Sequence, residues 1–482
     1  MGYCVALDGT KLPDVAVREI VLHSDFATAH YVVSKFITKR VLKPIHKRII
    51  LHESQHSHTL DLAPRGFGKS TVGDVDFCIT KILRDPNVRI MIGSKTQTQA
   101  EAFLKEIRTH FEQNLDLIRV FGNLQSRRWS DKEFTVNTRT IIRKEATVTA
   151  LGASGAVVSK HFDIIMADDL VGFENARTET QRQKLKEWFY SALMPTLEPD
   201  GEIHVLGTRY HPSDLYQDFM DSGNYSVQIQ RAINEKDGKE ISLWEEKFSL
   251  ETLQKIRAES GTIIFGMQYQ NDVELAKGDI FKADYFRYYD NFDMTEDGDV
   301  YVYLKNDETG ELIKRKVKVY FGIDLAISQA DSADYFVLFV VGIDSERNIY
   351  CLDYFRGRKT FDGQFNTIID YARKYPMVER IGVESVAYQM AMAQELRRTT
   401  NLPVISIKTA KDKVSRAFRR SALFENGKVF LRTNMHDFEN ELLLMSRNGD
   451  QEHDDMFDAF DFAITVSEHN NVNVLDRSMF RI

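Results

Sequence analysis

The sequence is poor in cysteine, proline and tryptophan, and it contains no long apolar run. Its 482 residues include three cysteines, nine prolines and three tryptophans. Cysteines as far apart as Cys4, Cys78 and Cys351 exclude a disulfide framework and a cysteine metal cluster, so a reducing compartment is expected. The longest apolar run, residues 335–343, is too short to span a bilayer. No cationic and then apolar leader opens the chain, so no membrane association is expected.

An excess of basic charge is also absent. The formal net charge of −8 argues against a uniformly basic nucleic-acid binder, although a local patch can still bind phosphate. With 43% hydrophobic residues, the chain can supply a core to each of the two or three domains that its length predicts.

The most informative stretch present is residues 63–71, APRGFGKST, which directly follow the apolar run 59–62. A strand, a glycine-bearing loop and a helix form a phosphate cradle, in which backbone N–H groups bind phosphate oxygens. We expect Lys69 to neutralise the outer phosphates and Ser70 to hold Mg²⁺. Ala63 stands where the usual pattern has glycine, and the alternative is an ordinary glycine-rich turn. The residues expected to contact the nucleotide are Gly66, Gly68, Lys69, Ser70 and Thr71.

The residues around and after this loop have an alternating α/β pattern. Helical spacing at 71–83, an apolar strand at 88–93 and helical spacing at 97–111 predict the beginning of a parallel sheet.

A second chemical signal is the pair Asp168 and Asp169, which ends the apolar stretch FDIIMADDL. In a phosphate-loop ATPase the first carboxylate supports Mg²⁺, and the second polarises the water that attacks the terminal phosphate. Glutamate is the more frequent second residue, so Asp169 reaches one methylene less far. The alternative is a pair of acids that ends a strand by chance.

A third strand end lies in EIHVLGTR, residues 202–209, where Thr208 could sense the terminal phosphate. An ordinary turn is the alternative, because Gly-Thr is common turn chemistry.

The composition changes between residues 278 and 317, where we expect a hairpin-like linker. Beyond it, Asp324 ends a strand, Glu384 ends a later strand, and Asp454, Asp455 and Asp458 begin a helix. These carboxylates can converge, and two Mg²⁺ or Mn²⁺ ions among them would activate water for phosphodiester cleavage. The alternative for the late aspartates is an acidic amphipathic helix.

A basic stretch at residues 397–432 contains ten Lys and Arg against two acids. Such a patch can exchange counterions for DNA phosphates without regard to sequence. A solvated basic helix is the alternative, and residues 139–144 and 152–155 are secondary DNA-binding candidates. The primary DNA-binding candidates are Lys411, Lys413, Arg416, Arg419, Arg420 and Lys428.

The motifs APRGFGKST, FDIIMADDL and LGTRYHPSDL, in this order, resemble the ATPase half of the large terminase subunits of tailed bacteriophages, which package viral DNA. The resemblance implies that Arg65 in the loop contacts the nucleotide. It also implies a coupling motif of Gly207, Thr208 and Arg209. The sequence departs from this family in two places. The adenine-reading glutamine of many relatives is not found near His46. Lys160 and His161 stand where an arginine often precedes the acidic strand.

The order of carboxylates in the second half resembles a ribonuclease H-like nuclease. The resemblance implies that Asp324, Glu384 and Asp455 form the metal triad, with Asp454 and Asp458 as alternates. The implied fold class is α/β, with an N-terminal P-loop (ASCE-type) ATPase domain and a C-terminal ribonuclease H-like nuclease domain. The expected boundaries are 1–277, 278–316 and 317–482.

The resemblance further implies an ATP- and Mg²⁺-dependent motor for double-stranded DNA, with a Mg²⁺- or Mn²⁺-dependent endonuclease. Its implied partners are a portal protein, a small terminase subunit and further copies in a pentameric ring on the capsid, with a monomer in solution as an alternative. The implied location is the cytoplasm of the infected bacterial host. Two other functions are a helicase-type or repair ATPase fused to a nuclease, and an ATPase with a noncatalytic DNA-binding second domain.

Overall fold

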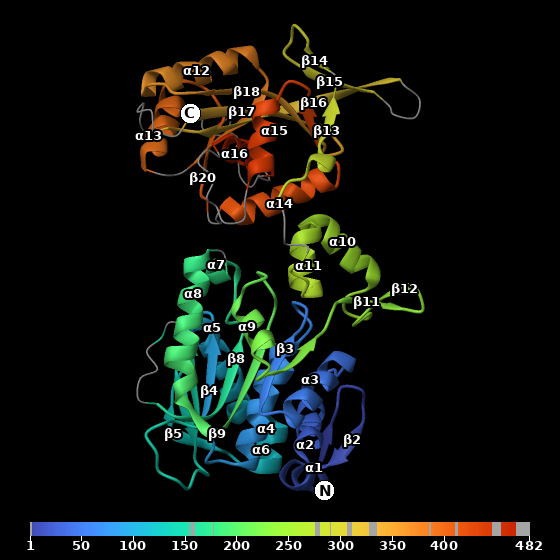
Figure 1. The fold of residues 1–482 in the computed structure, drawn as a ribbon, viewed down its shortest axis with the longest axis vertical. Coiled ribbons are helices and arrows are strands. Elements are labelled where there is room, and N and C mark those ends of the chain that lie inside the picture. Colours follow the sequence, from blue (N-terminus) through green and yellow to red (C-terminus); the bar gives the residue numbers. More distant parts are fainter. Residues whose placement is uncertain are drawn as a thin grey trace, which may run out of the picture. The chain divides into compact units, whose positions relative to one another are not determined.

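The computed structural model describes residues 2–153, 155, 160–176, 178–274, 280–289, 291–305, 311–326, 335–384, 387–409, 413–445 and 455–468. It separates into two compact units. The first comprises Met1–Arg257 and Thr262–Lys277, and the second comprises Ala258–Gly261 and Gly278–Ile482. Figure 1 labels their elements.

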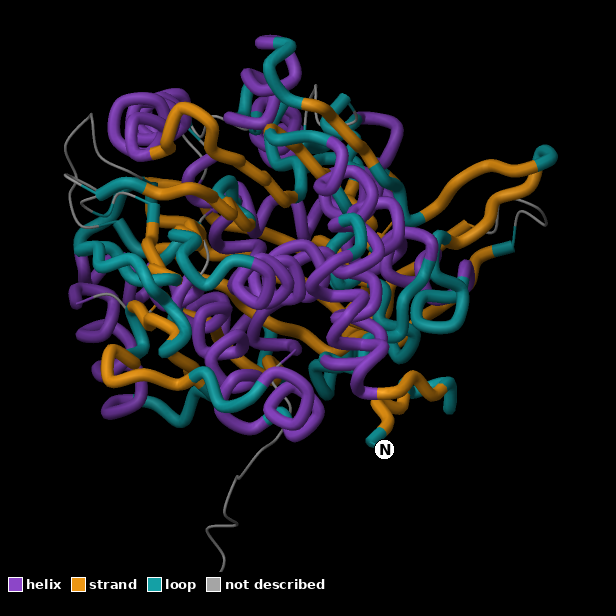
Figure 2. The backbone as a smooth tube through the Cα atoms, turned by 90° about the horizontal axis from the view of Figure 1, so that it is seen from below, coloured by secondary structure: helices purple, strands orange, loops and turns teal. Residues whose placement is uncertain are grey.

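The elements from the N-terminus to residue 270 are β1 (Tyr3–Val5), β2 (Lys11–Pro13), α1 (Asp14–His23), α2 (Phe26–Val32), η1 (Val33–Ile37), α3 (Pro44–Gln55), β3 (His58–Leu62), η2 (Thr71–Asp76), α4 (Phe77–Arg84), β4 (Ile90–Ser94), α5 (Gln97–Gln113), α6 (Leu115–Phe121), β5 (Gln125–Trp129), β6 (Glu133–Val136), β7 (Val148–Gly152), β8 (Phe162–Asp168), α7 (Phe173–Ala176), α8 (Glu179–Trp188), η3 (Phe189–Leu193), η4 (Met194–Thr196), β9 (Leu197–Gly207), α9 (Leu215–Ser222), β10 (Ser226–Ile229), β11 (Ile233–Lys236), β12 (Lys239–Ser242), α10 (Leu250–Ser260) and α11 (Thr262–Gln270). The short β1–β2 pair lies beside the N-terminus in Figure 2.

The first unit is built on an eight-stranded sheet in the order β10-β3-β9-β8-β4-β7-β6-β5. The first six strands of this order are parallel, and β6 and β5 complete the sheet antiparallel. The predicted parallel sheet is therefore confirmed, with an antiparallel edge.

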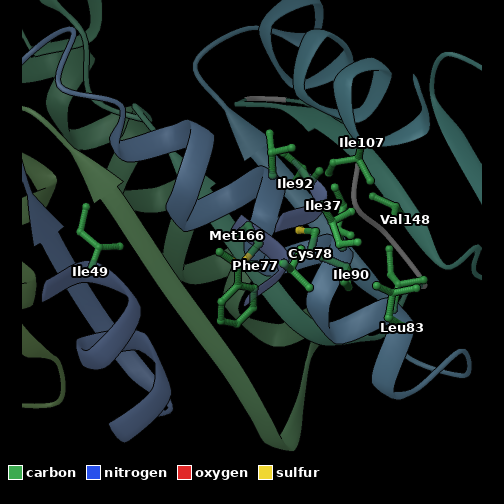
Figure 3. Close-up of a cluster of buried hydrophobic side chains, with 14 of the residues drawn as sticks. Ile37, Ile49, Phe77, Cys78, Leu83, Ile90, Ile92, Ile107, Val148 and Met166 are labelled. Atoms are coloured by element: carbon green, nitrogen blue, oxygen red, sulfur yellow. The ribbon is translucent and has the colours of Figure 1, made fainter. Parts of the chain in front are cut away.

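Strand β8 shows why helices cover both faces of this sheet. Its side chains alternate between the faces, as they must in a strand. Ile164 and Met166 belong to the core under α4 and α5, part of which is drawn in Figure 3. Ile165 and Ala167 belong to the core under α8 and α9. Because both faces are buried, β8 reads as a continuous apolar run that ends at its carboxyl tip.

The helix that follows the phosphate loop begins irregularly. The helical spacing predicted one helix over residues 71–83, whereas the chain forms a π-helical segment, η2, before α4. π-Helical turns are rare and occur often at functional sites, because they change which side chains face a neighbouring element. Here the turn includes the buried Asp74.

The second unit contains η5 (Ala283–Tyr285), β13 (Arg287–Tyr289), β14 (Asn291–Met294), β15 (Val300–Lys305), β16 (Leu312–Asp324), β17 (Phe336–Ile343), β18 (Ile349–Gly357), α12 (Phe361–Lys374), β19 (Val378–Glu384), α13 (Ala387–Thr399), β20 (Val404–Ile407), α14 (Lys413–Glu425), β21 (Val429–Arg432), α15 (His436–Leu444) and α16 (Asp455–Glu468). Its sheet follows β13-β21-β18-β17-β16-β15-β14, and β19 and β20 extend it from β16. The described residues of the expected linker, 278–316, thus supply strands to this sheet.

Helix α16 packs directly on the middle of this sheet. A Cβ at Gly322 would lie 1.8 Å from the carbonyl oxygen of Ala459, so only glycine permits this approach. Asp324 lies two residues farther along β16, and α16 carries Asp455 and Asp458 in its first turn. The close packing therefore brings the two sets of carboxylates together. Among the helices of the described ranges, none is long and apolar enough to cross a bilayer.

Candidate functional site

The phosphate loop leaves the end of β3, between β10 and β9 in the sheet. Gly66 and Gly68 both have positive φ, +80° and +77°, which side chains with a Cβ rarely adopt. The peptide N–H of Lys43 donates to His46 Nδ1 over 3.0 Å, which leaves Nε2–H to donate to the Phe67 carbonyl over 2.8 Å. The loop is therefore held from behind by a neutral histidine. Burial lowers the pKa of that His46.

Lys69 joins the three sequence motifs at one point. Its Nζ lies 3.2 Å from Asp169 Oδ2 and 3.4 Å from Thr208 Oγ1. Burial works against the charged amine, but Asp169 and Asp168 raise its pKa, so the side chain stays cationic. The ends of β3, β8 and β9 are thus linked by one buried ammonium group.

Asp168 has the features of a Mg²⁺ partner. It is 1% exposed, and its Oδ1 has no hydrogen-bond partner among the described atoms. Burial first, and then Asp169, raise the pKa of Asp168 to about 7, while Lys69 and a hydrogen bond with Ser70 lower it. A buried carboxylate without a full set of partners is costly unless a cation completes it. Ser70 and Asp168 therefore fit a magnesium site at this position.

Asp74 is a third carboxylate at this site, and the sequence analysis missed it. It is fully buried, and neither oxygen has a hydrogen-bond partner among the described atoms. Burial, Asp168 and Asp169 raise the pKa of Asp74 well above its usual value. Its position four residues after Ser70, one helical turn along, was a usable signal. The pKa of Glu53 is also raised well above its usual value, by burial and by the charges of Asp61 and Asp74.

The side chains of Arg65 and Arg209 both form hydrogen bonds within the protein. The Arg65 side chain donates to Gln268 Oε1 over 3.2 Å, and its backbone N–H donates to the Gln268 carbonyl over 3.0 Å. Arg209 is buried and donates to Asp214 over 3.1 Å and to Gln217 over 3.0 Å. Arg209 therefore fixes the segment after β9, while Thr208 faces Lys69.

The second group of predicted residues meets where α16 crosses the sheet of the second unit. Burial raises the pKa of Asp324 well above its usual value, and Asp458, Asp455 and Glu384 add to this. Asp455 Oδ2 accepts a hydrogen bond from the backbone N–H of Tyr335 over 3.2 Å. Mutual repulsion of this kind is what a bound cation relieves. These carboxylates are therefore chemically suited to bind a divalent metal ion.

Asp458, an alternate in the predicted ligand set, also contacts two cations. Asp458 Oδ2 is 2.5 Å from Lys413 Nζ, and its Oδ1 is 2.6 Å from Arg416 Nη2. Each oxygen thus contacts one cation and keeps a second lone pair, so Asp458 stays a predicted alternate ligand. Within the ranges that the structure describes, which exclude Asp454, no three His, Cys, Asp or Glu side chains are placed to hold an ion together.

The basic residues of α14 are engaged inside the second unit. Arg416 and Arg420 reach Asp461 over 2.8 and 2.5 Å, and Arg420 is only 1% exposed. Arg419 pairs with Glu468 over 2.8 Å. Lys428 donates to Asn348 over 3.2 Å. The count of charges in the sequence did not reveal these pairs, because α16 supplies the acids from far along the chain. Lys411 lies outside the described residues.

Known proteins resemble this chain in both halves. Residues 321–465 match the family described as "Terminase RNaseH-like domain". The chain is 27% identical over 195 residues to the protein named "Terminase, large subunit" of Enterobacteria phage T3, a match that covers 38% of this chain and 31% of the relative. The chain thus spans about a third of that relative's length.

Among solved structures, the chain is similar to the large terminase of a thermophilic bacteriophage, with a TM-score of 0.50 and 10% identity over 89% of this chain and 100% of the other. The same phage protein solved in complex with ADP gives the same TM-score of 0.50, 10% identity and coverage of 89% and 100%. At 10% identity, this similarity shows that the two proteins share a fold. The predicted fold class, a P-loop ATPase domain followed by a ribonuclease H-like nuclease domain, is confirmed.

Proposed function

We propose that the chain is a large terminase subunit of a tailed bacteriophage and acts as a viral DNA-packaging motor, which the matches of its second half and of its fold to large terminases support. It hydrolyses ATP to translocate double-stranded DNA into a procapsid, and it cuts concatemeric DNA with a metal-dependent endonuclease. The observation that carries the motor function is the meeting of Lys69 with Asp169 and Thr208 at 3.2 and 3.4 Å. We assign the motor to residues 1–277 and the nuclease to 317–482, connected by 278–316.

In the motor site, the loop residues 66–71 bind the ATP phosphates, and Lys69 neutralises the charge that develops on them. Mg²⁺ supplies Lewis-acid stabilisation when it is bound by Ser70 and Asp168. Asp169 polarises the attacking water, which requires its oxygen to leave Lys69 when a nucleotide enters. Thr208 senses the terminal phosphate, and Arg65 contacts the nucleotide from the loop.

In the nuclease site, Asp324, Glu384 and Asp455 would hold Mg²⁺ or Mn²⁺, and the bound ion would activate water for phosphodiester cleavage. Asp454 is an alternate ligand that lies outside the described residues. Asp458 is a further alternate ligand, which Lys413 and Arg416 also contact.

The proposed partners follow from the family. They are double-stranded DNA, a portal protein, a small terminase subunit and further copies of the chain in a ring on the capsid, pentameric by family resemblance. The proposed place of action is the cytoplasm of the infected bacterial host.

Two substitutions separate the two activities. Lys69→Ala should abolish ATP hydrolysis and leave Mn²⁺-dependent plasmid cleavage intact, because each site lies within its own unit. Asp324→Asn should do the reverse. Both are measured on the full chain by phosphate release and by plasmid digestion. An undiminished ATPase rate in Lys69→Ala would refute the motor site.

One observation favours a second candidate, in which the second unit binds DNA without cutting it. The carboxylate of Asp458 contacts two cations, Lys413 and Arg416. Plasmid digestion decides between the two functions, since cleavage that survives in Asp324→Asn would exclude the nuclease site proposed above.

A further inference from the structure

Arg356, the next-to-last residue of β18, lies in the same row of the sheet as Asp324. Asp324 of β16 is opposite Val337 of β17, and Val337 is opposite Arg356. Residues that are opposite each other in adjacent strands point to the same face, and each step across the sheet is about 5 Å. The Cα atoms of Asp324 and Arg356 are therefore roughly 10 Å apart, and both side chains lie on one face.

That face is the one on which α16 packs. Gly322, two residues before Asp324, lies against α16. Phe355, the neighbour of Arg356, packs instead against the core cluster to which α12 contributes. Because side chains alternate between the two faces along a strand, Arg356 points to the side of α16. Its guanidinium group is therefore on the face that carries the predicted metal ligands.

Tyr335 connects Arg356 to these ligands. Its backbone N–H donates to Asp455 Oδ2 over 3.2 Å, and the guanidinium carbon of Arg356 lies 4.3 Å from the centre of its ring. A second cation, Arg358, lies over the same ring at 4.5 Å. When an arginine stacks on an aromatic ring, the ring fixes the guanidinium plane and leaves the N–H donors at its edge for other partners. Tyr335 therefore contacts a predicted ligand and orients the cation beside it.

Arg356 can still bind a ligand from outside the protein. It is partly exposed, whereas Asp455 is 5% exposed. Among the residues that the structure describes, no carboxylate forms an ion pair with Arg356, and its Nε has no hydrogen-bond partner. A guanidinium group binds phosphate oxygens through two parallel N–H donors. Acidic side chains repel the DNA backbone, so a cation next to them makes its approach more favourable.

We propose that Arg356 binds a backbone phosphate of the DNA strand that the second unit cuts, next to the phosphate that is cleaved, and that Tyr335 positions it. A contact of this kind reads no base sequence. The assignment rests on the proposed nuclease function for its substrate, but phosphate binding by Arg356 can also be measured without cleavage.

The first test compares Arg356→Gln and Arg356→Lys with a control variant. Arg373→Gln removes a cation of α12 whose side chain is 77% exposed. Initial rates of plasmid cleavage by the full chain with Mn²⁺ are measured against DNA concentration. We expect Arg356→Gln to raise KM for DNA about tenfold and to change kcat less, because a charge-assisted contact to the substrate is lost. Arg356→Lys keeps the charge without the paired donors, so its KM should be intermediate. The control should match the wild type, and an unchanged KM in Arg356→Gln would overturn the proposal.

The second test needs no cleavage. The affinity of the full chain for a labelled duplex is measured against salt concentration without a divalent metal ion. Arg356→Gln should bind several-fold more weakly, with a log–log salt slope smaller by about 1, the value for one phosphate contact. An unchanged affinity and slope would overturn the proposal, even if the wild-type protein cuts no DNA. A wild-type protein that cuts no DNA, together with weaker binding by Arg356→Gln, would refute only the nuclease function.

A calorimetric titration with Mn²⁺ separates this proposal from a purely structural role. If Arg356 only balances the charge of the nearby acids, Arg356→Gln should change the affinity for Mn²⁺ and leave KM and the salt slope as they are. That result would overturn the proposal.

Discussion

Two carboxylates of the same cluster, Asp324 and Asp458, should respond in opposite ways to the same change. Asp458 holds Lys413 and Arg416 at 2.5 and 2.6 Å, and its side chain is 12% exposed. Removing one partner from a buried ion pair costs about 3–5 kcal/mol. Asparagine keeps one acceptor and Arg416 keeps Asp461, so Asp458→Asn should lower the free energy of unfolding of the second unit by about 2–3 kcal/mol.

Asp324→Asn should instead stabilise the metal-free second unit at neutral pH. Burial and the neighbouring acids raise the pKa of Asp324 well above its usual value. A carboxyl whose pKa is raised by folding loses stability as the pH rises above its unfolded value, and asparagine removes that loss. The substitution is nearly isosteric, so little packing changes.

The two predictions can be measured on the full chain. All three tryptophans, Trp129, Trp188 and Trp244, lie in the first unit. Tryptophan fluorescence during urea unfolding is therefore an internal control that neither variant should move. Hydrogen exchange of residues 455–468 reports the second unit. Calorimetric titration with Mn²⁺ completes the comparison. The reasoning is refuted if Asp458→Asn leaves the exchange unchanged and abolishes Mn²⁺ binding, because Asp458 would then be a metal ligand.

Two further predictions concern the first unit. Asp74→Asn should raise the Mg²⁺ concentration needed for ATP hydrolysis without lowering stability, because Asp74 is buried beside Asp168 and neither of its oxygens has a described partner; an unchanged Mg²⁺ dependence would remove it from the site. Although burial opposes it, hydrogen bonds from His204 and Lys81 lower the pKa of Glu202 to about 2. This stability is present above the unfolded pKa and is lost as the pH falls from about 4.5 toward 2, so Glu202→Gln should cost about 1–3 kcal/mol at pH 7 and nothing at the acid end, as measured by tryptophan fluorescence.

Local sequence determined most elements of both units and the strand ends that carry the predicted site residues. The run FDIIMADDL reads as a strand buried on both faces because each alternate set of apolar side chains needs a core, and β8 has one on each side. The loop 63–71 and the end of β9 could also be predicted from local sequence. In each, glycine and polar residues directly follow an apolar run, so a few consecutive residues specify both the turn and the polar groups it carries.

Only the tertiary structure decided which charges meet. The basic stretch at 397–432 read as a DNA surface because its own acids are few, yet α16 brings Asp458, Asp461 and Glu468 to it. The same packing, permitted by Gly322, also places Asp458 2.5 Å from Lys413. Asp74 and His46 lie at the proposed ATP site only because helices pack against the loop. Electrostatic energy falls with the distance between groups in space, and separation along the chain does not give that distance.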